Sequence, residues 1–371
     1  MEEFKQLKLA RSCAVSLASD PVYVMKFAAQ HQKDKELGLF AVAVSANNEI
    51  KLYDQDTFCT KGCLLGHEAG LSIIKFDILH PKYLWSASND GTIRLWDTEK
   101  KEDNVSIVSK CDVGYASMDI NCDGSILAAA TERHEEQLTI KLEFWDIRKI
   151  DEKAPKLLAT FEEVHSDDIT ILKFHPTNSK ILATGSTDGL VTILDLTTFE
   201  EEDALVQTLN TESSVNSIGF FGPSFEYMYA LTHIETIIIW KYMEGDVLTS
   251  IIDLREKSPK SVDYVIDCHY HEVSQRLFLI CGTHRGKMEV LHINLENVEA
   301  FQTMCGGHSS TIRCIHFSNN GLLTGAEDGM ICSWSFVKDG EGAPTVQTKS
   351  KAKTPNSKKA KKRSKPYKAN T

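Results

Sequence analysis

The sequence lacks the features that would assign it to a membrane, secreted or disulfide-bonded class. It has no apolar run long enough to span a bilayer, and apolar stretches such as residues 277–281 have the length of a strand. It opens Met1-Glu2-Glu3, without the basic and then apolar segments of a secretory signal. Its ten cysteines are scattered and include no Cys-x-x-Cys pair, which argues against a disulfide framework. We therefore expect a soluble intracellular protein.

Acidic residues are absent from one part of the chain and dominate the other. All 52 of them precede residue 349, together with 31 of the 41 lysines and arginines. Residues 1–348 therefore carry a formal charge of −21, whereas residues 349–371 carry +10. An acidic body offers few of the lysine and arginine side chains that phosphate binding requires. Nucleic-acid recognition by this body is not expected.

A basic run in the tail predicts a nuclear import signal. Short clusters of lysine and arginine are typical of the segments that import receptors bind. The run consists of Lys358, Lys359, Lys361, Lys362 and Arg363. The proline, serine and threonine residues around it favour disorder. The alternatives are a tail that only solvates the protein and one that contacts RNA non-specifically. We expect the protein in the nucleus, including the nucleolus, with a cytoplasmic fraction.

One short segment recurs along the body. Residues 84–97 return in similar form as residues 182–195 and 322–335. Each copy has a short strand, an Asp-Gly turn and a second strand with alternating apolar residues, which is typical of a β-hairpin. The end of the second strand is recognisable seven times, at Tyr53-Asp54, Trp96-Asp97, Trp145-Asp146, Leu194-Asp195, Trp240-Lys241, Leu291-His292 and Trp334-Ser335. These positions are 43 to 51 residues apart, a period that fits four short strands and their turns.

The repeats resemble those of the WD40 family. In that family a histidine, a serine or threonine, an aspartate and a closing tryptophan form a buried hydrogen-bonded set within one blade of a propeller. The matching residues are His67, Ser86, Asp90 and Trp96, then His165, Thr184 and Asp188 with Leu194 replacing tryptophan, and finally His308, Thr324, Asp328 and Trp334. The other four repeats are degenerate, and the one ending at Asp146 carries an insertion around residues 131–137.

The resemblance implies an all-β fold, a seven-bladed WD40 β-propeller. A closed ring hides the sheet edges that would otherwise pair with other chains. The last repeat ends after its third strand near Phe336, whereas residues 5–17 alternate as an unattached strand. We expect this N-terminal strand to complete the last blade and close the ring. The predicted domains are a propeller over residues 1–338 and a disordered basic tail over residues 339–371.

The residues that suggest chemistry have structural explanations. Serine, histidine and aspartate are the parts of a hydrolase triad, but a triad occurs once and these sets recur, so we expect no enzyme. Cys59 and Cys63 lack a second pair of metal ligands, and residues 268–271 (Cys-His-Tyr-His) would alternate between the faces of a strand. Residues 282–287 are one residue short of a phosphate-binding loop. No metal, cofactor or small-molecule substrate is expected.

The expected function is a non-catalytic scaffold for protein–protein interaction, in a nuclear or nucleolar assembly, without membrane contact. Propellers present variable loops on a rigid frame. An alternative comes from Trp145, Asp146 and Arg148, which resemble the motif by which many WD40 proteins dock onto the damage-binding adaptor of cullin–RING ubiquitin ligases. An ordinary blade end with a solvated arginine also explains this string. The acidic residues 200–203 are interpreted as a solvated turn, with contact to a basic partner as the alternative.

Overall fold

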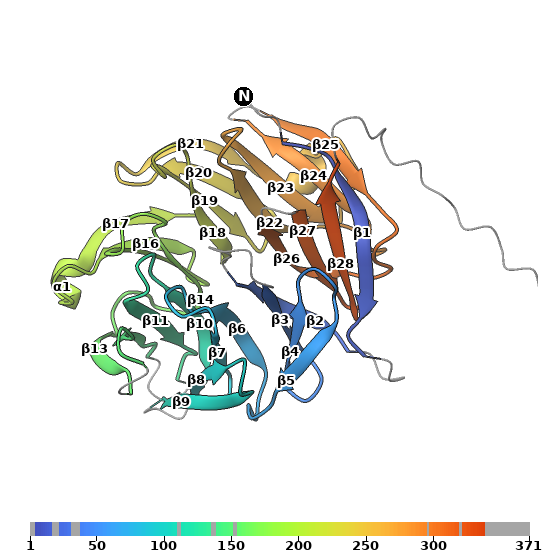
Figure 1. Ribbon diagram of the computed structural model, residues 1–371. Helices are drawn as coiled ribbons and strands as arrows, with labels where there is room; N and C mark the ends of the chain where they lie inside the picture. Colours follow the sequence, from blue (N-terminus) through green and yellow to red (C-terminus); the bar gives the residue numbers. More distant parts are fainter. Residues whose placement is uncertain are drawn as a thin grey trace, which may run out of the picture. The chain divides into compact units, whose positions relative to one another are not determined.

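The computed structural model describes residues 4–16, 22–30, 38–109, 113–134, 139–150, 154–294, 297–318 and 321–337. Across these residues, 28 strands form seven four-stranded antiparallel sheets. The sheets are arranged as blades around a ring (Figure 1), and Met1–Val337 belong to one compact unit. The prediction of an all-β, seven-bladed propeller is confirmed.

In blades 1 to 6 the four strands follow one another along the chain from the inside of the blade to its rim, whereas blade 7 takes its outer strand from the N-terminal part of the chain (Figure 1). Blades are numbered by their inner strands. The inner strands are β2 (Val24–Ala29), β6 (Leu71–Phe76), β10 (Tyr115–Ile120), β14 (Ile169–Phe174), β18 (Val215–Phe221), β22 (Tyr264–His271) and β26 (Ile312–Ser318). The second strands are β3 (Leu39–Val44), β7 (Tyr83–Ser88), β11 (Ile126–Thr131), β15 (Ile181–Ser186), β19 (Tyr227–Thr232), β23 (Arg276–Gly282) and β27 (Gly321–Ala326).

The third and outer strands complete the blades. The third strands are β4 (Ile50–Asp54), β8 (Thr92–Asp97), β12 (Leu142–Asp146), β16 (Leu190–Asp195), β20 (Ile237–Lys241), β24 (Met288–Ile293) and β28 (Met330–Phe336). The outer strands are β5 (Thr60–Leu64), β9 (Glu102–Val108), β13 (Lys156–Phe161), β17 (Leu205–Asn210), β21 (Asp246–Ile251), β25 (Val298–Met304) and, in blade 7, β1 (Leu7–Ala14). All seven predicted repeat ends fall in the last residues of third strands.

The predicted Asp-Gly turns join the second and third strands of blades 2, 4 and 7. In blade 2 the N–H of Gly91 donates to the carbonyl of Ser88 (3.3 Å), and in blade 4 the N–H of Gly189 donates to that of Ser186 (3.2 Å). Both glycines have positive φ angles, 76° and 84°. This left-handed conformation is accessible to glycine without the steric cost that a Cβ atom adds.

A β-bulge recurs where each inner strand begins. In all seven blades the register between the inner and second strands shifts there, as between Leu71 and Ile73 in blade 2. A bulge bends the strand and increases its local twist. Blade 6 keeps the bulge, between Val265 and Asp267, although it has lost the polar residues of the repeat. The backbone therefore preserves the repeat where the side chains no longer show it.

The hydrophobic core lies between neighbouring blades. Seven clusters of buried apolar side chains each join strands of two adjacent blades. Between blades 1 and 2, for example, Trp96 packs in one cluster with Ala28 and Leu52. Burying a large apolar side chain contributes about 2 kcal/mol, and both blades contribute several residues to each cluster. No blade can therefore bury its faces without its neighbours.

The N-terminal strand closes the ring, as predicted. β1 pairs antiparallel with β28, from Leu7 opposite Phe336 to Ala14 opposite Met330, and Figure 1 shows the two strands side by side. Leu7 is also held by blade 6, since the side chain of Gln302 accepts from its N–H (2.8 Å) and donates to its carbonyl (2.5 Å). The first and last parts of the propeller are thereby joined.

Helices contribute little to the fold. α1 (Glu201–Ala204) lies between β16 and β17, and α2 (Leu254–Lys257) lies between β21 and β22. In the part of the chain that the structure describes, neither helix has the length or apolar character needed to cross a membrane.

Candidate functional site

In blade 2 the structure brings together the four residues of the predicted polar set. His67 lies 2.7 Å from Asp90 through Nδ1 and 2.7 Å from Ser86 through Nε2. The indole N–H of Trp96 donates to Ser86 Oγ (2.7 Å). Ser86 lies on β7, Trp96 on β8 and Asp90 in the turn between them, while His67 precedes β6. The set therefore ties the start of the blade to its second and third strands.

Blade 4 has the same arrangement without its tryptophan. His165 lies 3.0 Å from Asp188 and 2.7 Å from Thr184, and Leu194 packs in the apolar cluster between blades 3 and 4. Thr184 is fully buried. The leucine contributes apolar contacts in place of an indole hydrogen bond.

Blade 7 keeps all four residues. His308 lies 3.3 Å from Asp328 and 2.7 Å from Thr324, and the indole N–H of Trp334 donates to Thr324 Oγ1 (2.9 Å). Thr324 is fully buried and Trp334 is 3% exposed. A substrate in solution could not reach the hydroxyl of this set.

The electrostatics of the sets also suit a structural role. Burial acts to raise the pKa of Asp90, but hydrogen bonds from Thr92, His67 and backbone N–H groups outweigh it and hold the pKa below its ordinary value. The pKa values of Asp188 and Asp328 are lowered in the same way, against the effect of burial, by their histidines and by backbone N–H groups. Each aspartate therefore accepts hydrogen bonds as a carboxylate near neutral pH.

Blade 3 shows what happens when the set is lost. Ala129 occupies the position equivalent to Ser86, and the buried indole N–H of Trp145 has no hydrogen-bond partner among the described residues. The same blade has a different polar pair, in which Tyr115 donates to Glu143 (2.7 Å). This substitution leaves an unsatisfied donor inside the ring.

The cysteines and histidines that the sequence offered as possible metal ligands have other contacts in the structure. Cys59 and Cys63 are exposed free thiols. His269 stacks on Phe317 with ring centroids 3.8 Å apart, whereas Cys268 packs in the cluster between blades 5 and 6. Burial lowers the pKa of His269 to about 4. Among the described residues, no group of three or more histidine, cysteine, aspartate or glutamate side chains is placed to hold a metal ion.

Residues 282–287, which the sequence compared with a phosphate-binding loop, form a tight turn between β23 and β24. The N–H of Thr283 donates to the carbonyl of Lys287 (2.9 Å), and the N–H of Gly286 donates to the carbonyl of Thr283 (3.0 Å). The glycine has a φ of 74°, so its conformational freedom serves the turn.

Arg148 lies just beyond β12 with its side chain exposed. Its guanidinium donates to the carboxylate of Asp146 through Nε (2.9 Å) and through a terminal nitrogen. Trp145, by contrast, is half-buried against the cluster between blades 2 and 3. Of the three residues of the docking motif, the arginine is therefore the one most available to a partner.

Two predicted features lie wholly or partly outside the described residues. The basic run Lys358, Lys359, Lys361, Lys362 and Arg363 belongs to the tail beyond residue 337. Of the predicted insertion, residues 135–137 are also outside them. Arg133, which is described, donates its backbone N–H to Asp168 (2.7 Å).

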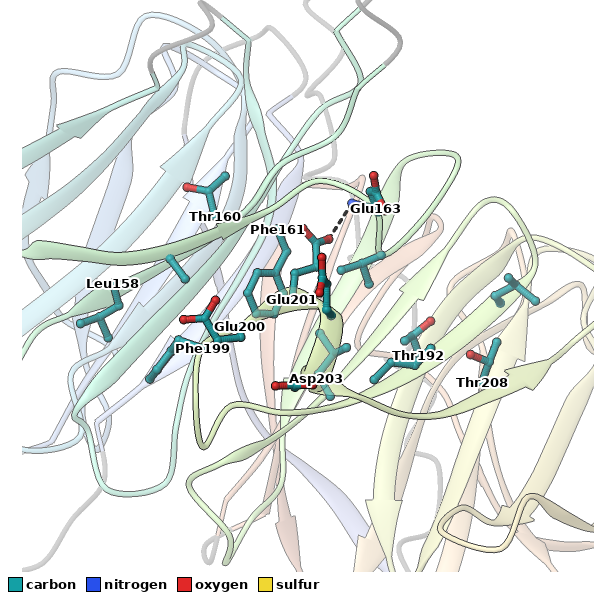
Figure 2. Close-up of a pocket in the computed structure, with 16 residues that line it drawn as sticks. Leu158, Thr160, Phe161, Glu163, Thr192, Phe199, Glu200, Glu201, Asp203 and Thr208 are labelled. Atoms are coloured by element: carbon teal, nitrogen blue, oxygen red, sulfur yellow. Dashed lines mark hydrogen bonds between the residues drawn. The ribbon is translucent and has the colours of Figure 1, made fainter.

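A groove that the sequence did not predict separates the outer parts of blades 3 and 4. Its volume is about 910 Å³, and it is lined by β13, β16, β17 and the segment that contains α1. Figure 2 shows Leu158 and Thr160 on one side and Thr192 and Thr208 on the other. The acidic residues 200–203 form part of its lining. The one feature of the sequence that indicated this groove was the long connection of residues 196–204 between β16 and β17.

Comparison with known proteins agrees with the geometry. The family model described as "WD domain, G-beta repeat" matches residues 59–97, 155–195 and 300–335, and these segments contain the three polar sets. The chain is 27% identical to WD repeat-containing protein 89 homolog of Dictyostelium discoideum, over 79% of each chain. It is 29% identical to WD repeat-containing protein GTS1 of Arabidopsis thaliana, over 91% of this chain and 87% of that protein. With its seven blades and matching repeats, the chain belongs to the WD40-repeat family.

Proposed function

We propose that this protein is a non-catalytic scaffold that holds partner proteins within a nuclear or nucleolar assembly. WD40 propellers are generally protein-interaction scaffolds and are typically non-catalytic. The observation that carries the proposal is that the three Ser/Thr-His-Asp sets are used inside their own blades. Partner proteins would therefore bind to the loops and the rim of the ring.

The geometry of the sets explains why they favour a scaffold over a hydrolase. Acyl transfer requires a nucleophile that reaches the substrate and a base that is free to take its proton. Ser86 is fully buried, and its hydroxyl already interacts with His67 and Trp96. The contact with a histidine recurs in blades 4 and 7, and the contact with a tryptophan recurs in blade 7. Repetition at equivalent positions supports a shared structural task.

The rim offers apolar side chains for partners. In blade 5, Val247 and Leu248 on β21 are 59% and 39% exposed, and Met243 in the preceding turn is 50% exposed. Large apolar side chains in contact with water favour association. The nuclear part of the proposal is supported by the basic run between Lys358 and Arg363.

The scaffold proposal is tested by affinity capture of the tagged full-length chain from nuclear extract, followed by quantitative mass spectrometry. We expect a reproducible set of stoichiometric partners. The double variant Val247→Asp, Leu248→Ser should lose a subset of them while its melting temperature stays within a few degrees of the wild type. Val273→Asp, at another exposed valine, is the matched control. Capture of no stoichiometric partner would overturn the proposal.

A second candidate is a substrate receptor of a cullin–RING ubiquitin ligase, favoured by the exposed guanidinium of Arg148. Docking would have to displace its contact with Asp146, which costs little because exposed ion pairs contribute about 0–1 kcal/mol. In the same capture experiment, Arg148→Ala should remove the damage-binding adaptor and its cullin, whereas Lys149→Ala should retain them. An adaptor that never appears, or that survives Arg148→Ala, would reject this candidate.

A further inference from the structure

The walls of the groove between blades 3 and 4 are fixed to each other. The carboxylate of Glu201 accepts the backbone N–H of Glu162 at 2.9 and 3.0 Å and that of Glu163 at 2.6 Å, and Figure 2 marks the contact with Glu163. Ala204, at the end of α1, is fully buried. These contacts tie α1 of blade 4 to the segment that follows β13 of blade 3. A ligand would therefore meet a groove whose shape is already set, which lowers the entropic cost of binding.

Part of the groove is apolar. The ring of Phe199 packs against that of Phe144, with centroids 5.7 Å apart, and it lines the groove together with Leu158 and Leu205. Leu205 is 58% exposed although it is a large apolar side chain. A ligand that covered it would gain the free energy of burying apolar surface.

Carboxylates line the groove beside this apolar part, and the ammonium of Lys180 lies 5.5 Å from the centroid of the Phe199 ring. Glu163, Glu200, Glu202 and Asp203 line the groove and are exposed, and the described residues of the lining include no lysine or arginine. Within the described part of the chain, none of these four carboxylates forms an ion pair. Each therefore remains available to a cationic group from outside. An anionic ligand such as a nucleic acid would be repelled.

A nearly buried threonine on the wall of the groove points independently to a ligand. Thr192 on β16 is 3% exposed and lines the groove. In the described part of the chain its side-chain hydroxyl makes no hydrogen bond. The hydroxyl is not one of the buried side-chain atoms that lack a partner among the described residues, so it is still in contact with the open space of the groove. A ligand with a donor or acceptor at this position would complete it.

We propose that this groove binds a short basic segment of a partner protein, with lysine or arginine set between apolar residues. The cations would face the four carboxylates, the apolar residues would cover Phe199 and Leu205, and the backbone would reach the hydroxyl of Thr192. The inference rests on the scaffold function and assigns it a place and a partner chemistry. Charge complementarity selects this occupant over an acidic protein, because opposite charges steer association and like charges oppose it.

The test uses a fluorescein-labelled peptide of Lys-Leu-Arg-Ser repeats and the full-length chain, with binding measured by fluorescence anisotropy. One control peptide carries glutamate at the lysine and arginine positions, and another carries serine at the leucine positions. We expect the basic, leucine-containing peptide to bind more tightly than either control, with an affinity that falls as salt is raised.

Two charge-reversed variants separate the groove from the general acidity of the propeller. Glu202→Lys with Asp203→Lys should weaken binding by about tenfold, as expected for two ion pairs. Glu99→Lys with Glu272→Lys makes the same change in net charge at exposed sites outside the groove. It should change the affinity by less than about twofold.

Thr192→Val tests the hydroxyl without altering shape or charge. Loss of one hydrogen bond should weaken binding about fivefold, whereas the melting temperature should stay equal because the hydroxyl makes no hydrogen bond within the described part of the chain. Unchanged affinity in this variant, or equal loss in both charge-reversed variants, would overturn the groove proposal. Binding that requires removal of residues 349–371 would assign the groove to the chain's own tail and would also overturn it. The scaffold function fails separately, if affinity capture finds no partner.

Discussion

At the scale of single residues, one hydroxyl decides whether a blade-closing tryptophan finds a hydrogen-bond acceptor. Ser86 in blade 2 accepts the indole N–H of Trp96 (2.7 Å). Ala129 stands at the same position of blade 3, where the indole N–H of Trp145 finds no partner in the part of the chain that the structure describes. The two blades thus provide a natural comparison between a complete and an incomplete set.

Ser86→Ala should destabilise the propeller by about 2 kcal/mol, because it leaves His67 and Trp96 with unsatisfied buried groups. The free energy of unfolding measured in urea checks this value. Ser125→Ala, at a site outside the three polar sets, serves as a control and should cost less. Equal stability of Ser86→Ala and the wild type would contradict the role given to the set.

Ala129→Ser should have the opposite effect. A hydroxyl at this position offers an acceptor to the indole N–H of Trp145, and one added hydrogen bond is worth about 1 kcal/mol. The same urea experiment should show a higher midpoint with an unchanged slope. A destabilised variant would mean that the site has no room for the oxygen atom.

At the scale of strands, closure by β1 joins the first and last blades. Leu7 is 1% exposed and packs between blades 6 and 7, whereas Leu9 on the same strand is 38% exposed. Leu7→Ala should therefore cost about 3 kcal/mol, and Leu9→Ala less than about 0.5 kcal/mol. Similar losses in the two variants, measured by denaturant unfolding, would show that β1 does not contribute to the core as described.

The interface between blades 6 and 7 should also respond to acid. Burial, with a smaller effect from His271 and His316, lowers the pKa of His269 from 6.5 to about 4 in the folded protein. As the pH falls below 6.5, the unfolded chain binds a proton that the folded chain excludes, so stability decreases until the folded histidine protonates near pH 4.

Between pH 7 and pH 5 this histidine should reduce the free energy of unfolding by about 2 kcal/mol. His269→Phe keeps a ring against Phe317 and removes the titration, so its stability should fall less over the same interval. Urea midpoints at the two pH values make the comparison. A variant as pH-sensitive as the wild type would assign the effect to other groups.

The sequence predicted features that lie within one repeat better than features that lie between repeats. The resemblance of a single repeat to the WD40 family was enough to place His67, Ser86 and Asp90 together. The groove needed the packing of blade 3 against blade 4, which brings Leu158 near residues 199–205. The acidic residues 200–203 could be read from the sequence, but the place of Thr192 on the wall of the groove depends on neighbours that are distant in the sequence.

At the scale of the whole molecule, charge divides the chain into an acidic body and a basic tail. If Lys358 to Arg363 act as an import signal, removal of residues 349–371 should move the protein from the nucleus to the cytoplasm. Fluorescence microscopy of the tagged chain, with a variant that keeps the tail but replaces these five basic residues by alanine, makes the test. Unchanged nuclear accumulation would count against the signal.

The most direct test of the account measures folding and partner capture together in Asp188→Asn. Asp188 interacts with His165 and accepts two backbone N–H groups in blade 4, so the variant should be less stable. The account predicts that partner capture at each temperature falls only in proportion to the folded fraction. Loss of partner capture in a fully folded variant would contradict it, because the set would then act on partners directly.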